Sequence, residues 1–404
     1  MKRSFVFTAA SFFVLLSVIF IPFPFNLSKI QFDITEFFFS GLIGFVSKNI
    51  FSKPLNDTHV HSDTTAMYIL ILLLVVLSVI ITVVLSQIKA WAKYRDRIFK
   101  FIYLLASYYL ALQLFKYGLD KVFKNQFYLP EPNTLYTPMG KVPRDLLYWS
   151  SMGTSHFYNV FLGIIEALAA IFLLIKRTRL IGLLLSFFVM INIVAVNFGF
   201  DISVKVFSLI LLFLNVYLLI PYLKNLYQFF FSKQGTTAYP GGEVVLVKNH
   251  FLSSSVKWFV IGIILLESFY PFVRAGNFNG DLAKRPYLHG AYEVKEFIAG
   301  VDTLEPHNFP FKRFFVHKDS YMIFQDQQDE MADYKLSATS KASEYLLTDY
   351  QMRQTRLQLT YNEADSLLTF QYFKGEQLNK ITGKALDWRK MTALKKEFHW
   401  TIDQ

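Results

Sequence analysis

Seven long runs of apolar residues are the feature that most restricts the fold of this chain. Each run is about 20 residues long, the length that an α-helix needs to cross the hydrocarbon core of a bilayer. Composition agrees, since 53% of the 404 residues are hydrophobic. The sequence therefore predicts a polytopic α-helical membrane protein with about seven transmembrane helices. The runs are Phe5–Phe25, Met67–Ile88, Ile98–Leu119, Tyr158–Ile175, Leu180–Phe198, Val204–Leu223 and Val256–Phe272.

Two segments near the N-terminus need a separate interpretation. The run Phe5–Phe25 follows Met-Lys-Arg, as a secretory signal does, but it ends without a small-residue cleavage site. An uncleaved span is therefore favoured. The stretch Phe32–Phe51 is apolar but is interrupted by Asp33, Glu36 and two glycines, so it is expected to lie in the interface instead of crossing the membrane.

Basic residues predict the orientation of the spans, because cytoplasmic loops are enriched in Lys and Arg. They precede the first run and occupy the second, fourth and sixth connections: Lys2, Arg3, Lys89, Lys93, Arg95, Arg97, Lys100, Lys176, Arg177, Arg179, Lys224, Lys233, Lys248 and Lys257. Seven spans then place the N-terminus in the cytoplasm and the C-terminus outside. We expect a multi-pass protein of the cell inner (cytoplasmic) membrane.

The net charge of +11 lies entirely in residues 1–273, since residues 274–404 carry 18 basic and 18 acidic side chains. A cationic excess confined to membrane loops indicates a lipid bilayer as partner and no nucleic acid. The chain has no cysteine, which excludes disulfides, thiolate chemistry and cysteine-ligated cofactors.

Period-two alternation of apolar and polar residues begins after about residue 274. It is visible in Phe311–Lys318, Tyr321–Gln325, Arg356–Tyr361 and Leu367–Phe373, with turn residues between such runs. We expect an antiparallel β module of about eight strands, closed as a small barrel or a curved sheet. The predicted parts are an N-terminal transmembrane hairpin with an outer interfacial segment (1–94), a four-helix unit (95–230), a cytoplasmic loop (231–255), the last transmembrane helix (256–273) and an extracytoplasmic β-rich domain (274–404).

Eight polar residues lie within or at the ends of the apolar runs, and the predicted directions of the spans place all eight in the outer half of the membrane. A charge in hydrocarbon costs about 3 kcal/mol on insertion scales, so such residues usually have a function. Glu166 needs a proton or a cation, which Lys121 or Lys205 could supply, and Asp201 could pair with Lys205. These residues form a predicted pocket for a ligand or for protons; the alternative is that they only hold helices together. They are Tyr117, Lys121, Gln126, Glu166, Asn192, Asn197, Asp201 and Lys205.

Residues about 95–225 resemble the DoxX family of small polytopic membrane proteins. The resemblance is carried by Tyr117-Gly118, Lys121, Gln126-Phe127, Pro138, Gly140, Trp149, Met152-Gly153, Ser155, Tyr158, Phe161, Gly163, Glu166, Arg177-Thr178, Gly182, Asn192, Asn197, Asp201 and Val204-Lys205. The tail is similar to the extension of longer DoxX-like members at Gly290–Val294 and at Phe398–Ile402. The family implies a four-helix bundle and, in some members, a subunit of quinol- or thiosulfate-linked oxidoreductase complexes.

Function is less constrained than fold. No nucleophile–base–orienter set or metal cluster is apparent, because His59 and His61 beside Asp57 and Asp63 fit a solvated loop better than a metal site. The sequence favours a non-catalytic envelope or complex component with an intramembrane polar pocket, docking an extracytoplasmic protein partner through residues 274–404. No cofactor is evident. The alternative is a quinone-binding membrane subunit in which Glu166 handles protons.

Overall fold

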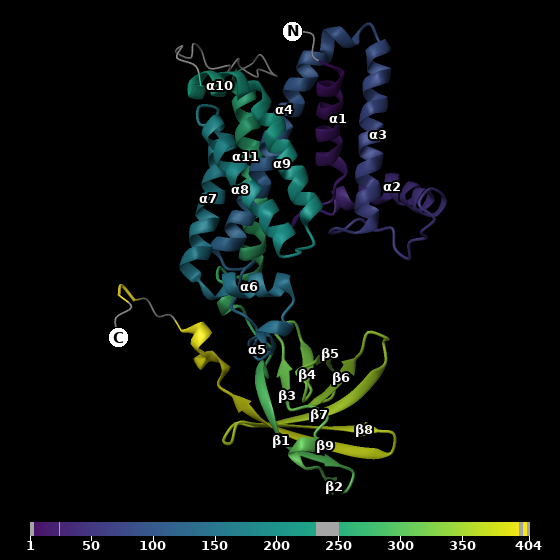
Figure 1. The fold of residues 1–404 in the computed structure, drawn as a ribbon, viewed down its shortest axis with the longest axis vertical. Helices are drawn as coiled ribbons and strands as arrows, with labels where there is room; N and C mark the ends of the chain where they lie inside the picture. The colour runs from purple at the N-terminus through teal and green to yellow at the C-terminus, as the bar shows by residue number, and fades with distance from the viewer. Residues whose placement is uncertain (1–3, 24, 232–249, 396–398, 402–404) are drawn as a thin grey trace. The chain divides into compact units, whose positions relative to one another are not determined.

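The computed structural model describes residues 4–23, 25–231, 250–395 and 399–401, and it consists of two compact units (Figure 1). The helical unit comprises Met1–Gln126 and Phe157–Asn279, and the barrel unit comprises Phe127–His156 and Gly280–Gln404. Each unit is therefore built from two separated stretches of the chain. Pro24, most of the predicted loop 231–255, and Phe398 and Ile402 of the predicted tail resemblance lie outside the described residues.

Apolar helices make up the helical unit. They are α1 (Phe5–Phe20), α2 (Ile30–Asn49), α3 (Thr65–Gln87), α4 (Trp91–Val122), α7 (His156–Leu174), α8 (Arg179–Gly199), α9 (Lys205–Leu219), α10 (Leu223–Phe231) and α11 (His250–Ala275). Within the described residues, seven helical stretches are long and apolar enough to cross a membrane, which confirms a multi-pass architecture. These stretches include α2, whereas α1 has 16 residues and is shorter.

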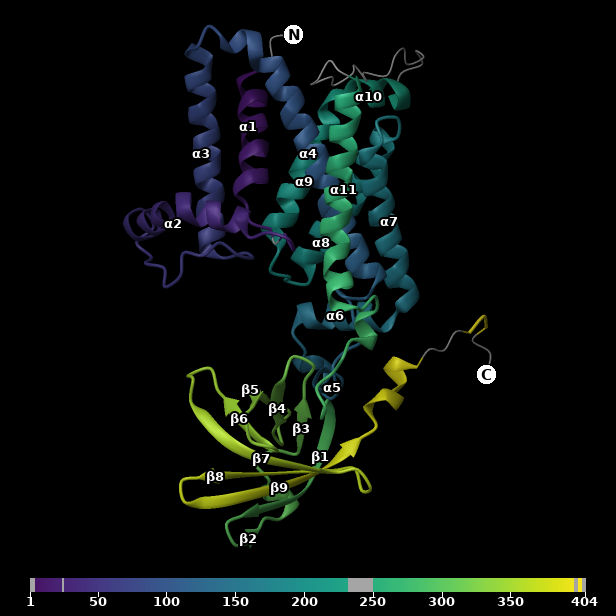
Figure 2. The same ribbon diagram turned by 180° about the vertical axis from the view of Figure 1, so that it is seen from behind.

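Helices α1 and α2 differ in direction. In both views α1 runs alongside α3, while α2 lies across them (Figures 1 and 2). One face of α2 is buried through Thr35, Phe39 and Ile43, and another exposes Phe37 and Phe38. This arrangement is the one expected of an interfacial helix, although α2 is also long and apolar enough to cross, so its position in the membrane stays a prediction.

A proline turns the chain after α9. The 3₁₀ turn Ile220–Tyr222 contains Pro221, which cannot continue the hydrogen-bond ladder of α9. The helix α10 that follows exposes Tyr227 and Phe230 on one face, and its polar residues Lys224, Asn225 and Gln228 lie together on another face. This arrangement makes α10 amphipathic.

The strands of the barrel unit form one antiparallel sheet in which β1 also pairs with β9, so the sheet closes. Eight strands make up the barrel, and the two-residue β2 extends the end of β1, which confirms the predicted β module. The strands are β1 (Gly290–Ala299), β2 (Asp302–Thr303), β3 (Arg313–Val316), β4 (Tyr321–Gln325), β5 (Met331–Ala338), β6 (Glu344–Thr348), β7 (Gln354–Asn362), β8 (Leu367–Lys374) and β9 (Gln377–Leu386).

Side chains fill the barrel interior. Phe314, Leu368, Phe370 and Ile381 are at most 1% exposed, and they point inward from alternate positions of their strands. Gly383 allows this filling, because a Cβ at that position would lie 2.4 Å from the ring of Phe314. The barrel is a packed core and not an open channel.

Residues 127–156 precede α7 in the sequence but belong with the barrel. They include α5 (Pro132–Leu135), the 3₁₀ turn η1 (Met139–Lys141) and α6 (Arg144–Thr154). Leu135 and Tyr136 pack on an apolar cluster on the outside of the barrel that contains Phe315 and Ile323. This cover explains why β3 is buried on both faces.

Candidate functional site

A buried ion pair joins α4 to α7. The Lys121 Nζ lies 2.8 Å from the Glu166 Oε2, and the two residues are 6% and 4% exposed. Of the two lysines considered for Glu166, Lys121 is therefore its partner. A charge-assisted hydrogen bond at this distance neutralises both groups where hydrocarbon would otherwise surround them.

Two glycines bring α4 and α7 into backbone contact beside this pair. A Cβ on Gly118 would lie 2.8 Å from the Gly163 carbonyl oxygen, and a Cβ on Gly163 would lie 2.5 Å from the Gly118 carbonyl oxygen. Lys121 and Glu166 each follow their glycine by three residues. Because helical side chains tilt toward the N-terminus and the two helices are antiparallel, the two side chains meet across the glycine contact.

Tyr117 belongs to the same group. Its ring centroid lies 5.4 Å from the Lys121 Nζ and 5.5 Å from the ring of Phe23. Gln126 follows the end of α4, where its backbone N–H donates to the Asp120 carbonyl at 3.0 Å. Its side-chain oxygen is buried and has no hydrogen-bond partner among the described residues. The described hydrogen bond of Gln126 is thus with the end of α4.

Asp201 and Lys205 form a second, more exposed group at the start of α9. The Lys205 Nζ lies 2.7 Å from the Asp201 Oδ1, so the pair expected across this turn is present. Asp63 adds a carboxylate 3.8 Å from the same Nζ. It also accepts the backbone N–H groups of Lys205 and Val206, at 2.9 and 3.0 Å, and so caps α9 from a distant part of the chain.

The two asparagines of α8 have different environments. Asn197 is 5% exposed, and its side-chain nitrogen has no partner within the described chain. Asn192 is exposed on the outside of the helical unit. Sequence reasoning treated the eight residues as one cluster, whereas the described contacts join Tyr117, Lys121 and Glu166 in one group and Asp201 and Lys205 in another.

A second buried ion pair was missed by the sequence interpretation. The Lys116 Nζ lies 3.0 Å from the Glu267 Oε1 of α11, and the two residues are 9% and 2% exposed. The Glu267 carboxylate also accepts the backbone N–H groups of Asn26 and Leu27. The rule that selected Glu166 would have found this pair, because both residues lie inside predicted spans.

The barrel unit contains a polar centre around Glu131, which is 4% exposed. Its Oε2 lies 2.7 Å from the His289 Nε2 and accepts the Lys318 backbone N–H at 3.2 Å, and its Oε1 lies 3.4 Å from Arg285. Burial alone would raise the pKa of Glu131, but His289, followed by His317 and Arg285, holds it below its usual value. Burial lowers the pKa of the neighbouring His317.

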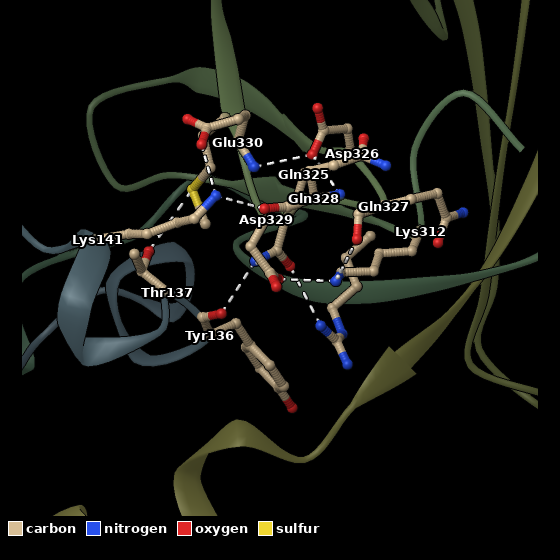
Figure 3. A network of polar contacts seen from close by, with 12 residues as sticks. Tyr136, Thr137, Lys141, Lys312, Gln325, Asp326, Gln327, Gln328, Asp329 and Glu330 are labelled. Carbon is tan, nitrogen blue, oxygen red and sulfur yellow. Dashed lines mark hydrogen bonds and ion pairs between the residues drawn. The ribbon is translucent and has the colours of Figure 1, made fainter.

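Figure 3 shows the polar contacts that fix the segment after α5 to the β4–β5 turn. Lys141 pairs with Glu330, and the Gln325 side-chain amide donates to the Tyr136 carbonyl at 3.0 Å. The Arg313 guanidinium lies 4.9 Å from the ring centroid of Tyr136. The polar groups of this network are paired with one another, so the network attaches the segment after α5 to the β4–β5 turn. Across the described residues, no group of three or more His, Asp or Glu is placed to hold a metal ion.

Comparison with known proteins yields a relative but no known activity. No family model matches the chain, and no solved structure matches it. Over 111 residues the chain is 39% identical to the uncharacterized protein YwoB of Bacillus subtilis (strain 168). The matched stretch is 28% of this chain and 70% of that protein. The chain therefore belongs to the same protein family as YwoB.

Proposed function

We propose that this protein is a non-catalytic, DoxX-like component of the cell envelope. Its helical unit spans the cytoplasmic membrane, and its barrel unit docks an extracytoplasmic protein partner. The observation that carries the proposal is the Lys121–Glu166 pair, which is buried and bonded directly between α4 and α7. A self-neutralised pair beside a glycine contact holds two helices in a fixed relation, as interhelical polar contacts commonly do.

The way in which the chain connects the two units supports a role for α4 and α7 in the response to partner binding. The chain passes from the end of α4 into residues 127–156 of the barrel unit and returns into α7. The two helices joined by the ion pair are thus the two that lead into and out of the segment packed on the barrel. In this proposal, the polar residues around Glu166 serve to hold α4 and α7 in position and do not bind a ligand.

The proposed orientation is N-terminus inside and C-terminus outside. In both views the α3–α4 and α7–α8 connections and α10 lie at one end of the helical unit, and α2 and the α8–α9 connection lie at the other (Figures 1 and 2). The first end carries Lys93, Arg95, Lys176, Arg177 and Lys224. An excess of basic residues at one end supports its placement in the cytoplasm.

Site-specific photo-crosslinking in intact cells tests whether the barrel unit binds a protein partner. Photoreactive residues would replace Val301 and Tyr350, which are 96% and 81% exposed on the barrel unit. We expect a discrete crosslinked species from at least one position, with the exposed Lys224 of α10 as the matched cytoplasmic control. Crosslinks absent from every exposed barrel position, with the protein correctly inserted, would contradict the proposal.

The second candidate is a quinone-binding subunit, and the position of Tyr117 favours it. Its ring lies between Lys121 and Phe23 at the outer end of α4, a combination of aromatic and cationic groups that suits a quinone headgroup. Gentle solubilisation followed by absorption spectroscopy and lipid mass spectrometry decides between the two. A stoichiometric quinone that is lost in Glu166→Gln supports this candidate, and a colourless protein with bulk lipid supports the first.

A further inference from the structure

A continuous polar face runs along α4 inside the helical unit. Tyr109, Gln113, Lys116 and Asp120 follow one another at intervals of four, three and four residues, so they share one side of the helix. At about 1.5 Å per residue they cover roughly 16 Å of the helix axis. The first three are 7%, 0% and 9% exposed. Lys116 has its partner in Glu267, and Asp120 accepts from Asn125 at 3.1 Å.

The deep end of this face lacks hydrogen-bond partners. Gln113 is fully buried, and within the described part of the chain neither its amide oxygen nor its amide nitrogen has a partner. The Tyr109 hydroxyl is also without a hydrogen bond of normal geometry, although it faces the amides of Gln113 and Gln31. Three polar atoms of two adjacent turns are therefore unsatisfied at the same place.

Among the described groups, the side chain of Gln31 faces the Tyr109 hydroxyl, but none of its hydrogen bonds reaches Gln113. The Gln31 amide already accepts from the Phe23 backbone N–H at 2.9 Å and donates to the Val18 carbonyl at 3.0 Å. A direct bond between Tyr109 and Gln113 would satisfy only one end of the Gln113 amide. Each buried polar group left unpaired in hydrocarbon costs several kcal/mol, so the remaining atoms need a partner from solvent.

We propose that Tyr109 and Gln113 bind at least one ordered water molecule inside the helical unit. A buried water typically makes about three hydrogen bonds, and the Tyr109 hydroxyl with the two ends of the Gln113 amide offers that number. The inference goes beyond the proposed function and does not rest on it.

The same helix face shows from which side the water is supplied. Toward the outer end it continues as Lys116 and Asp120, whose charged groups can hydrogen-bond to water. Toward the N-terminal end of α4 the face continues as Ala106, Ile102 and Phe99, which are at most 2% exposed and entirely apolar. The water site is therefore the inner end of a polar path that begins near the Lys121–Glu166 pair and stops midway along α4.

Radiolytic footprinting of the full-length protein in lipid nanodiscs tests this site. X-rays produce hydroxyl radicals from water, and a radical formed beside Tyr109 modifies its ring. We expect Tyr109 to be modified several-fold faster than Tyr292. That residue is similarly buried at 4% exposed, but its hydroxyl donates to the Leu288 carbonyl at 2.9 Å in the barrel. Equal, low modification of the two tyrosines would overturn the proposal.

A substitution then locates the water. Gln113→Leu removes two of its hydrogen-bonding groups, and we expect the modification of Tyr109 to fall several-fold. The matched control is Asn215→Leu, which replaces another fully buried amide, whose nitrogen donates to the Leu183 carbonyl and to Ser186. Gln113→Met preserves side-chain length if the leucine variant does not fold. Unchanged Tyr109 modification in a folded Gln113 variant would refute the assignment to Gln113.

Discussion

At the scale of single residues, two buried lysine–glutamate pairs set the electrostatics of the helical unit. Lys121–Glu166 connects α4 to α7, and Lys116–Glu267 connects α4 to α11. Both depend on α4, which thereby contributes a cation to two neighbouring helices. Removing one member of such a pair is more damaging than removing both, because a lone charge then remains in a low-dielectric environment.

Lys121→Met is expected to destabilise the protein by about 3–5 kcal/mol, the usual cost of leaving a buried charge unpaired. The double variant Lys121→Met/Glu166→Gln is expected to regain most of this loss. Denaturant unfolding of the purified full-length chain measures both values. Lys205→Met is the control, because its nearer partner Asp201 is 78% exposed and Asp63 keeps its two backbone hydrogen bonds, so the loss should be smaller. Equal losses in the single and double variants would show that the pairing contributes nothing.

The barrel unit is expected to lose stability as pH falls from about 7 to 5. Burial lowers the pKa of His317 below its ordinary value near 6.5. The unfolded chain therefore binds a proton there before the folded chain does, and stability is lost as pH falls toward the folded pKa. Glu131, Asp319, Lys318 and His289 face this imidazole. Because the pKa of Glu131 is also lowered, its own contribution is lost only at more acidic pH.

Hydrogen exchange of peptides that cover β3 and β4, corrected for the intrinsic effect of pH, measures this loss. In His317→Gln the decrease between pH 7 and pH 5 is expected to become smaller. If the variant and the parent protein lose protection in parallel, another group governs the response.

At the scale of elements, close helix contact depends on residues that have no side chain. Gly163→Ala would place a methyl group 2.5 Å from the Gly118 carbonyl oxygen, so α4 and α7 must separate and the Lys121–Glu166 bond must lengthen. We expect a marked fall in melting temperature. Gly262→Ala on α11 is the matched control, since a Cβ there meets nothing within 4 Å and the substitution favours helix. Equal melting temperatures in the two variants would contradict the packing described here.

Helix α2 is predicted to lie in the outer interface with Phe38 and Leu42, which are exposed on the side away from Asp33, toward the acyl chains. The natural chain has no cysteine, so a maleimide labels only the single cysteine that each variant introduces. In proteoliposomes, Asp33→Cys should react quickly with a charged maleimide and Phe38→Cys slowly, although both side chains are exposed in the protein. If α2 crossed the bilayer, cysteines at Asp33 and Asn49 would be labelled from opposite sides.

Sequence patterns predicted elements better than they predicted contacts. Alternation in Tyr321–Gln325 and Leu367–Phe373 matches β4 and β8, because one face of each strand must fill the barrel. The partner of Glu166 remained open between Lys121 and Lys205, since depth along a helix does not fix which neighbour it packs against. The packing of Tyr136 on Phe315 was not anticipated, because no local pattern reports a contact between such distant segments.

At the scale of the whole molecule, charge asymmetry predicts the topology. A periplasmic-type reporter fused after Gln404 should be active, and the same reporter inserted between Lys176 and Arg177 should be inactive. Both results follow from the enrichment of cytoplasmic loops in basic residues. An inactive C-terminal fusion, with normal protein levels, would refute an odd number of crossings.

The membership of residues 127–156 in the barrel unit also determines the order of events during synthesis. Tyr136 is made 189 residues before Gln325, to which it is hydrogen-bonded. The apolar side of the segment with α5 and α6 must therefore stay uncovered while α7 to α11 and the first strands are synthesised. Closure of the barrel comes later still, because β1 pairs with β9. Slow translation or an early stop within residues 280–386 is expected to leave exposed apolar surface on the part already made, and such surface is a target for chaperones and proteases.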